Sequence, residues 1–277
     1  MAKKSVVRKK RQEEDIIIKD INTGFNNNIL STLKIDVKHK NDTQKKFTHS
    51  IKQNDVTICT GPAGTGKTFL TVAEAILLLK THPDIYHNIR LLKSVTQLKG
   101  EDIGFLPGEV DAKLKYNMMS FINAFNNLIG EANTNKLIEA GMIKFELFGS
   151  IRGLSYKNAI IIVDEFQNID HDKAKTFLTR FEPTTKVIVL GDTEQIDIKN
   201  KHESSLRRLI DRVTKKPTEG VGVIEFDESH IVRNRLTSYF IDIFKEPVKP
   251  ETSRYYQQPQ IKKPTLLEKI KSFFKIS

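Results

Sequence analysis

The sequence from Val56 to Thr68 reads VTICTGPAGTGKT, and its last eight residues match the phosphate-binding pattern G-x-x-x-x-G-K-[ST] at every position. These eight residues are Gly61, Pro62, Ala63, Gly64, Thr65, Gly66, Lys67 and Thr68. The glycines let the backbone fold tightly around phosphate oxygens, and a helix that begins near Gly66 presents the positive end of its dipole to them. Lys67 would reach the β- and γ-phosphates, and the Thr68 hydroxyl would hold Mg²⁺. The apolar run before the motif favours a nucleotide site over a plain glycine-rich turn.

The length and composition of the chain limit its class. The 277 residues suffice for one large domain or two small ones with a sizeable core. The single cysteine, Cys59, excludes an intramolecular disulfide and a cysteine-rich zinc site, and we expect it to pack in its strand. No apolar run approaches the length of a membrane span, and residues 1–15 lack the apolar core of a secretion signal. We therefore expect a soluble, cytoplasmic protein without a membrane contact.

The net charge of +11 is concentrated at the two ends of the chain. Residues 1–15 carry +3 and residues 248–277 carry +5, so the part between them is close to neutral for its size. Basic tails suggest a polyanionic partner, because each cation laid on a phosphate releases a counterion. The alternative is that the tails only solvate the protein. We expect a basic tail and lead-in at 1–35, a single domain at 36–246, a proline-rich linker at 247–264 and a short amphipathic basic helix at 265–277.

Apolar strands and helices alternate along the chain, which is typical of an α/β fold with a mainly parallel sheet and helices on both faces. The unbroken apolar runs 159–163 and 186–190 are typical of central strands covered on both faces. An apolar stripe at helical spacing between 114 and 129 predicts a core helix. The other expected strands are 56–60, 89–92, 142–147 and 221–226, and the other expected helices are 69–79, 136–140, 204–213 and 236–244.

Polar side chains follow the two most apolar runs, where ligands of such sheets bind. Asp164 and Glu165 come directly after the run 159–163. Asp164 is expected to hold Mg²⁺ through water, and Glu165 to orient or deprotonate an attacking water. Gln195, in the segment GDTEQID after the run 186–190, could touch both the γ-phosphate and this water; a surface position is the alternative. These residues favour an NTPase over a small-molecule kinase.

The chain resembles the PhoH family of P-loop ATPases, which is related to the first RecA-like domain of superfamily-one helicases, from about residue 42 to residue 246. The matching segments are GPAGTGKT, GEDIGFLPGEV, IRG, DEFQN, FLTR, GDTEQID and HIVRN. The resemblance implies a RecA-like P-loop fold that binds ATP and Mg²⁺. Gln44 stands where the family carries a glutamine similar to the adenine-reading Q motif, with a surface glutamine as the alternative. The resemblance also implies that Arg152 and Arg233 lie near the nucleotide or a subunit boundary.

The chain departs from the family pattern at several positions. Lys93-Ser94 replaces the usual Arg-Pro, and Leu154 replaces an arginine, so we assign no nucleic-acid contact to Leu154. Phe166 stands where alanine is usual. His230 replaces a common acidic residue and is expected to be structural, since the seven histidines show no metal-ligand spacing.

The resemblance implies an ATPase that hydrolyses ATP to ADP and phosphate and is coupled, in a helicase-like way, to RNA or single-stranded nucleic acid. Only about fifty residues separate GDTEQID from the linker, too few for a second RecA-like domain. An arginine finger should therefore come from a neighbouring subunit of a homo-oligomeric ring, a hexamer by resemblance. A second hypothesis is a nucleotide-controlled scaffold that recruits a nuclease or another partner through the helix 265–277. Family members are common in tailed phages, which is consistent with this Lys- and Asn-rich chain.

Overall fold

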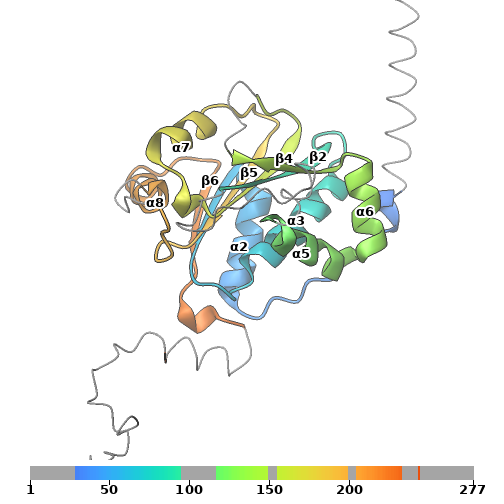
Figure 1. Cartoon of the computed structure of the whole chain (residues 1–277), viewed down its shortest axis with the longest axis horizontal. Coiled ribbons are helices and arrows are strands. Elements are labelled where there is room, and N and C mark those ends of the chain that lie inside the picture. Colours follow the sequence, from blue (N-terminus) through green and yellow to red (C-terminus); the bar gives the residue numbers. More distant parts are fainter. Residues whose placement is uncertain (1–28, 95–116, 149–154, 199–203, 233–242, 244–277) are drawn as a thin grey trace, which may run out of the picture. The chain divides into compact units, whose positions relative to one another are not determined.

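The computed structural model describes residues 29–94, 117–148, 155–198, 204–232 and Ile243. The chain divides into two compact units, Met1–Arg233 and Asn234–Ser277, and the sheet and its helices belong to the first. Within its described residues, six strands form one sheet in the order β3-β2-β4-β5-β1-β6, and all pairings are parallel (Figure 1). The predicted α/β fold with a mainly parallel sheet is therefore confirmed.

The observed elements follow the predicted ones closely. The strands are β1 (Val56–Thr60), β2 (Asn88–Lys93), β3 (Ile143–Leu147), β4 (Ala159–Asp164), β5 (Lys186–Gly191) and β6 (Val221–Glu225). The helices are α2 (Asp42–Gln53), α3 (Lys67–Thr81), α5 (Met119–Ile129), α6 (Glu131–Glu139), α7 (His171–Leu178) and α8 (Ser205–Lys215), with 3-10 turns η2 (Phe166–Asn168) and η4 (Glu228–His230). Residues 1–28 of the predicted tail, the predicted linker and the predicted terminal helix lie outside the described residues, as does the predicted helix 236–244 apart from Ile243. The boundary of the predicted tail at residue 35 is wrong, because Leu30 and Leu33 are each 3% exposed and belong to the core of the domain.

Two helices, α2 and α7, were not predicted from the sequence. Both begin at a side-chain cap: Asn41 Oδ1 accepts the N–H of Gln44 (2.8 Å), and Asp170 Oδ1 accepts the N–H of Lys173 (2.9 Å). Each helix buries few apolar side chains, so its apolar stripe is short. Packing on the sheet, rather than a strong sequence period, therefore stabilises these two helices.

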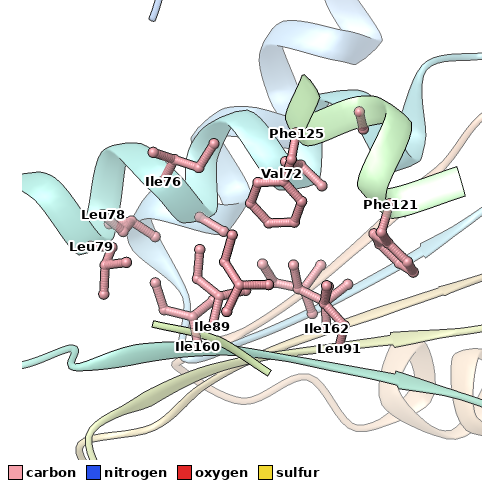
Figure 2. Packing of buried hydrophobic residues seen from close by; sticks show 14 of the residues in the cluster. Val72, Ile76, Leu78, Leu79, Ile89, Leu91, Phe121, Phe125, Ile160 and Ile162 are labelled. Atoms are coloured by element: carbon pink, nitrogen blue, oxygen red, sulfur yellow. The ribbon is translucent and has the colours of Figure 1, made fainter. Parts of the chain in front are cut away.

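Helices cover both faces of the sheet, as predicted. Strand β4 shows why: Ile160 and Ile162 join the core beneath α2, α3, α5 and α6, while Ile161 and Val163 join the core beneath α7 and α8 (Figure 1). Successive side chains of a strand point to opposite faces, so an unbroken apolar run serves two cores. Figure 2 shows the first core, with Val72, Ile76, Leu78 and Leu79 of α3 and Phe121 and Phe125 of α5 over Ile89, Leu91, Ile160 and Ile162.

The strand order positions the site. Strand β5 lies between β4 and β1, and all three run in the same direction. Their carboxyl ends therefore meet at one edge of the sheet, where ligands of open α/β sheets bind. This brings the loop after β1, the acidic pair after β4 and the GDTEQID segment after β5 together.

A buried lysine ties this part of the sheet to α2. Lys186, the first residue of β5, is 4% exposed, and its Nζ donates hydrogen bonds to the carbonyl oxygens of Ile51 (2.7 Å) and Asn54 (2.6 Å). Burial lowers the pKa of Lys186, and attraction to Asp55 opposes this effect. The ammonium group thus satisfies carbonyl groups at the end of α2.

Within the described parts of the chain, no helix combines the length and apolar content that a bilayer span requires.

Candidate nucleotide site

The loop between β1 and α3 has the backbone that the phosphate-binding motif predicts. Gly61, Gly64 and Gly66 have positive φ angles of 140°, 92° and 92°. A side chain at Gly61 would collide with the backbone carbonyl of Phe226, and a Cβ at Gly66 would lie 3.0 Å from Nε2 of Gln44. Glycine alone tolerates both the left-handed conformation and these close approaches. Helix α3 begins directly after the loop, so its N-terminus faces the same space.

The side chain of Lys67 folds back over this loop. Its Nζ donates hydrogen bonds to the carbonyl oxygens of Gly61 (2.5 Å) and Pro62 (2.9 Å). Burial lowers the pKa of Lys67, while attraction to the carboxylates at the ends of β4 and β5 opposes this effect. Phosphate oxygens are charged acceptors and bind an ammonium group more strongly than carbonyls do. Lys67 is therefore placed to exchange its carbonyl partners for a phosphate.

Asp164 ends β4 at the carboxyl edge of the sheet and is partly buried. Burial and the neighbouring Glu165 raise the pKa of Asp164 to about 6, against attraction from Lys93 and Lys67. A carboxylate in this environment is stabilised by a cation beside it. Thr68 lines the same pocket, so a carboxylate and a hydroxyl are available together. This set of oxygen donors fits Mg²⁺, which prefers such ligands and keeps several of its waters.

Glu165 adopts a left-handed backbone conformation, with φ 55° and ψ 38°. Few residues with a side chain do so, and such conformations are concentrated at functional sites. Three hydrogen bonds hold it: its N–H donates to Asp164 Oδ1 (3.0 Å), its carbonyl accepts from the N–H of Asn168 (2.9 Å), and its Oε2 accepts from Gln167 Nε2 (2.6 Å). In this arrangement Glu165 lines the same pocket as Lys67 and Thr68.

Gln195 reaches this pocket from the loop after β5. Its Nε2 donates a hydrogen bond to Asp192 Oδ2 (2.9 Å), and its side chain is exposed. Both Gln195 and Asp192 line the pocket that holds Lys67 and Asp164. The structure therefore brings together Lys67, Thr68, Asp164, Glu165 and Gln195, and Gln195 is an exposed loop residue that lines this pocket.

The pocket has a volume of about 540 Å³, within the range of small-molecule sites. The phosphate-binding loop and the carboxyl ends of β2, β4 and β5 form most of it. Helix α5 forms another wall with Ser120, Asn123 and Asn127, which the sequence pattern did not single out. These polar residues occupy one face of a helix that was recognised only by its apolar stripe on the other face.

Gln44 supports the loop from behind. It is 3% exposed, its Nε2 donates to the carbonyl oxygen of Thr65 (2.9 Å), and its Oε1 accepts from the N–H of Lys40 (2.7 Å). The alternative of a surface glutamine is therefore excluded, while its role in reading adenine stays a prediction.

His230 forms a 2.8 Å hydrogen bond with Thr43 Oγ1, on the same helix as Gln44. This bond agrees with a structural role for His230.

The two candidate arginines, Arg152 and Arg233, lie outside the described residues. Val232, the residue before Arg233, donates its backbone N–H to the carbonyl oxygen of Gly64 (3.0 Å). The described chain thus contacts the phosphate-binding loop at this point. Whether either arginine serves a neighbouring site stays a prediction.

A family model described as PhoH-like protein matches residues 36–245, which is most of the chain. This chain belongs to the PhoH-like family. Its relatives include the PhoH-like protein of Bacillus subtilis (strain 168), which is 32% identical over 208 residues, or 75% of this chain and 64% of the relative. Protein PhoH of Escherichia coli (strain K12) is 31% identical over 199 residues, or 71% of this chain and 55% of the relative. This PhoH-like chain thus spans less than two thirds of these relatives' length.

Solved structures resemble this PhoH-like chain only distantly. The HK97 bacteriophage large terminase has a TM-score of 0.41 and 16% identity, and the match covers 68% of this chain and 40% of the terminase. The Pif1 helicase from Candida albicans has a TM-score of 0.36 and 18% identity, with coverage of 75% and 43%. The fold assignment therefore rests on the sheet order and loop geometry of the chain itself. Family and site together identify a nucleotide-binding protein of the P-loop class, whose members bind their nucleotide with Mg²⁺.

Proposed function

We propose that the chain hydrolyses ATP to ADP and phosphate by activating a water molecule. The observation that supports this most is the arrangement of Asp164, Glu165 and Gln195 at the ends of adjacent strands, in one pocket with the phosphate-binding loop. A kinase would use its acceptor substrate as the nucleophile and would not need a second carboxylate and an amide beside the γ-phosphate. The preference for adenine rests on the family resemblance at Gln44.

Each residue has a separate role in this proposal. Lys67 would leave the carbonyl oxygens of Gly61 and Pro62 and bind the β- and γ-phosphates. Thr68 and Asp164 would hold Mg²⁺, which neutralises charge on the phosphates when it is bound. Glu165 would orient the attacking water or accept its proton, and Gln195 would contact that water and the γ-phosphate.

We propose further that this ATPase acts on RNA or single-stranded nucleic acid. The excess of positive charge, +11 overall, supports a polyanionic partner. Added RNA or single-stranded DNA should raise ATP turnover severalfold, and the stimulation should fall steeply between about 50 and 200 mM salt because bound cations release counterions. Turnover by the wild-type chain, measured with and without each polyanion over this salt range, tests the proposal, with Lys67→Ala as the inactive control. ATP binding and assembly without turnover would instead support the scaffold hypothesis.

We also propose that the chain forms a homo-oligomeric ring in which Arg152 or Arg233 reaches the nucleotide of the neighbouring subunit. If so, turnover per chain should decrease on dilution as the ring dissociates, because each site would lose its partner. Arg152→Ala combined with Arg233→Ala should lower turnover at least tenfold in the assembled protein. Sedimentation at the assay concentration would show that the variant still assembles. Full activity of the assembled double variant would contradict the trans-arginine proposal.

A further inference from the structure

The side chain of Gln167 joins the acidic pair to the loop that carries Gln195. It is fully buried, and its Nε2 donates hydrogen bonds to Glu165 Oε2 (2.6 Å) and to the carbonyl oxygen of Gln195 (3.0 Å). Its Oε1 accepts the N–H of Asp192 (3.0 Å). Both N–H groups of the amide and its oxygen are therefore hydrogen-bonded, and their partners lie on two different segments of the chain. A carboxylate and a carbonyl need donors whereas an N–H needs an acceptor, so these partners also fix the orientation of the amide.

The surrounding residues leave room for this amide and no more. At Gly191 an added Cβ would lie 2.6 Å from Gln167 Oε1 and 2.6 Å from Leu206 Cδ2. The absence of a side chain at Gly191, the last residue of β5, thus lets Gln167 cross from η2 to the loop after β5. A buried amide with all of its groups paired has one arrangement, because leaving any of them unpaired is costly.

We propose that Gln167 is a positioning residue that holds the carboxylate of Glu165 in its working orientation and links it to the loop of Gln195. The inference rests on the proposed hydrolysis of ATP. Gln167 engages Oε2 of Glu165, while Oε1 has no hydrogen bond among the described residues and is available to a water molecule. Any shift of the Gln195 loop when nucleotide binds would be transmitted to Glu165 through the same amide.

The neighbouring residue Asn168 provides a matched control. Its side chain also reaches this loop: Oδ1 accepts the N–H of Asp197 (2.8 Å), and Nδ2 lies 3.4 Å from Asp197 Oδ2. Asn168 is similarly buried, but its side chain makes no hydrogen bond with Glu165. Removing it therefore loosens the loop without freeing the carboxylate.

The test compares Gln167→Met, Gln167→Glu and Asn168→Leu in the full chain. Gln167→Met should lower kcat for ATP about 10- to 100-fold with KM within about threefold, because the substrate still binds but the carboxylate is no longer aligned. Asn168→Leu should change kcat by less than about threefold. Hydrogen exchange of the segment 191–197 should become faster in both variants, which shows that the loop alone does not explain the loss in kcat.

Gln167→Glu adds a readout that a purely structural role would not change. In this variant the new carboxyl group lies beside the carboxylate of Glu165, and repulsion between the two negative charges raises the pKa of the pair, so that one proton is held between them. The protonated carboxyl group then donates a hydrogen bond to the other. The kcat of Gln167→Glu relative to wild type should therefore rise as the pH falls from 9 to 6, while the ratio for Gln167→Met stays constant. If the wild type hydrolyses ATP and Gln167→Met has the same kcat, the positioning role alone is overturned. The same holds if the ratio of the kcat of Gln167→Glu to that of the wild type does not change with pH. An inactive wild type would overturn the proposed function as well.

Discussion

Glu165→Gln should lower ATP turnover by about 10²- to 10⁴-fold and leave ATP binding nearly unchanged. The substitution keeps the size of the side chain and its ability to accept the hydrogen bond from Gln167. It removes the negative charge that would orient or deprotonate the attacking water. The phosphate-binding loop, Lys67 and the Mg²⁺ ligands remain intact, so the loss should appear in kcat rather than in the dissociation constant for ATP.

The measurement is single-turnover hydrolysis together with binding of a fluorescent ATP analogue. Glu194→Gln is the matched control, because it makes the same change of charge on an exposed residue of the same loop region as Gln195, outside the nucleotide pocket. It should retain turnover within about twofold. Glu165→Gln with near wild-type turnover would remove Glu165 from the chemistry, and loss of ATP binding would assign it to the binding of nucleotide instead.

Asp164→Asn should lower Mg²⁺-dependent ATP turnover at least about 100-fold. The same substitution should stabilise the nucleotide-free protein above neutral pH. The folded protein raises the pKa of Asp164 to about 6, above its ordinary value of 3.8. The folded state therefore binds this proton more tightly than the unfolded state does. Its contribution to stability is present below about pH 4 and is lost as the pH rises through 6. Asparagine cannot ionise and avoids this loss, which amounts to about 1–3 kcal/mol.

Thermal unfolding from pH 4 to pH 8 without nucleotide tests this prediction. The melting temperature of Asp164→Asn should equal that of the wild type near pH 4, exceed it by a margin that grows between about pH 4 and pH 6, and keep that margin at higher pH. Asp84→Asn, which alters an exposed carboxylate outside the pocket, should show no such trend. In the wild type, Mg²⁺ should compete with the proton, so its half-saturating concentration for turnover should rise below pH 6. A less stable Asp164→Asn at pH 8 would contradict the assigned electrostatics.

Local sequence patterns were sufficient for the phosphate-binding loop and for both central strands. Glycine tolerates the positive φ angles of a tight loop, and the three glycines before Lys67 adopt them. The runs that became β4 and β5 are apolar throughout because both faces of these strands are covered, and polar residues mark the points where the strands end. Asp164, Glu165 and Gln195 could be chosen as candidates for this reason alone.

The sequence was less informative about α2, α7 and the supporting contacts of the site. Gln44 and Gln167 are polar residues in a polar context, so nothing in the local pattern indicates that they are buried. The long-range bonds of Lys186 to the end of α2 and of Gln167 to the loop after β5 join segments that are far apart along the chain. Such partners depend on the packing of the whole sheet.

By itself, then, the sequence determined which segments are strands, which loop can hold a triphosphate and which side chains stand at strand ends, because these features depend on neighbouring residues. Tertiary structure alone decided the strand order β3-β2-β4-β5-β1-β6, which places β5 between β4 and β1. It also decided that the buried amide of Gln167 joins the carboxylate of Glu165 to the loop after β5. The physical reason is that parallel pairing and the burial of amide groups satisfy hydrogen bonds between distant segments, and no local pattern specifies those partners.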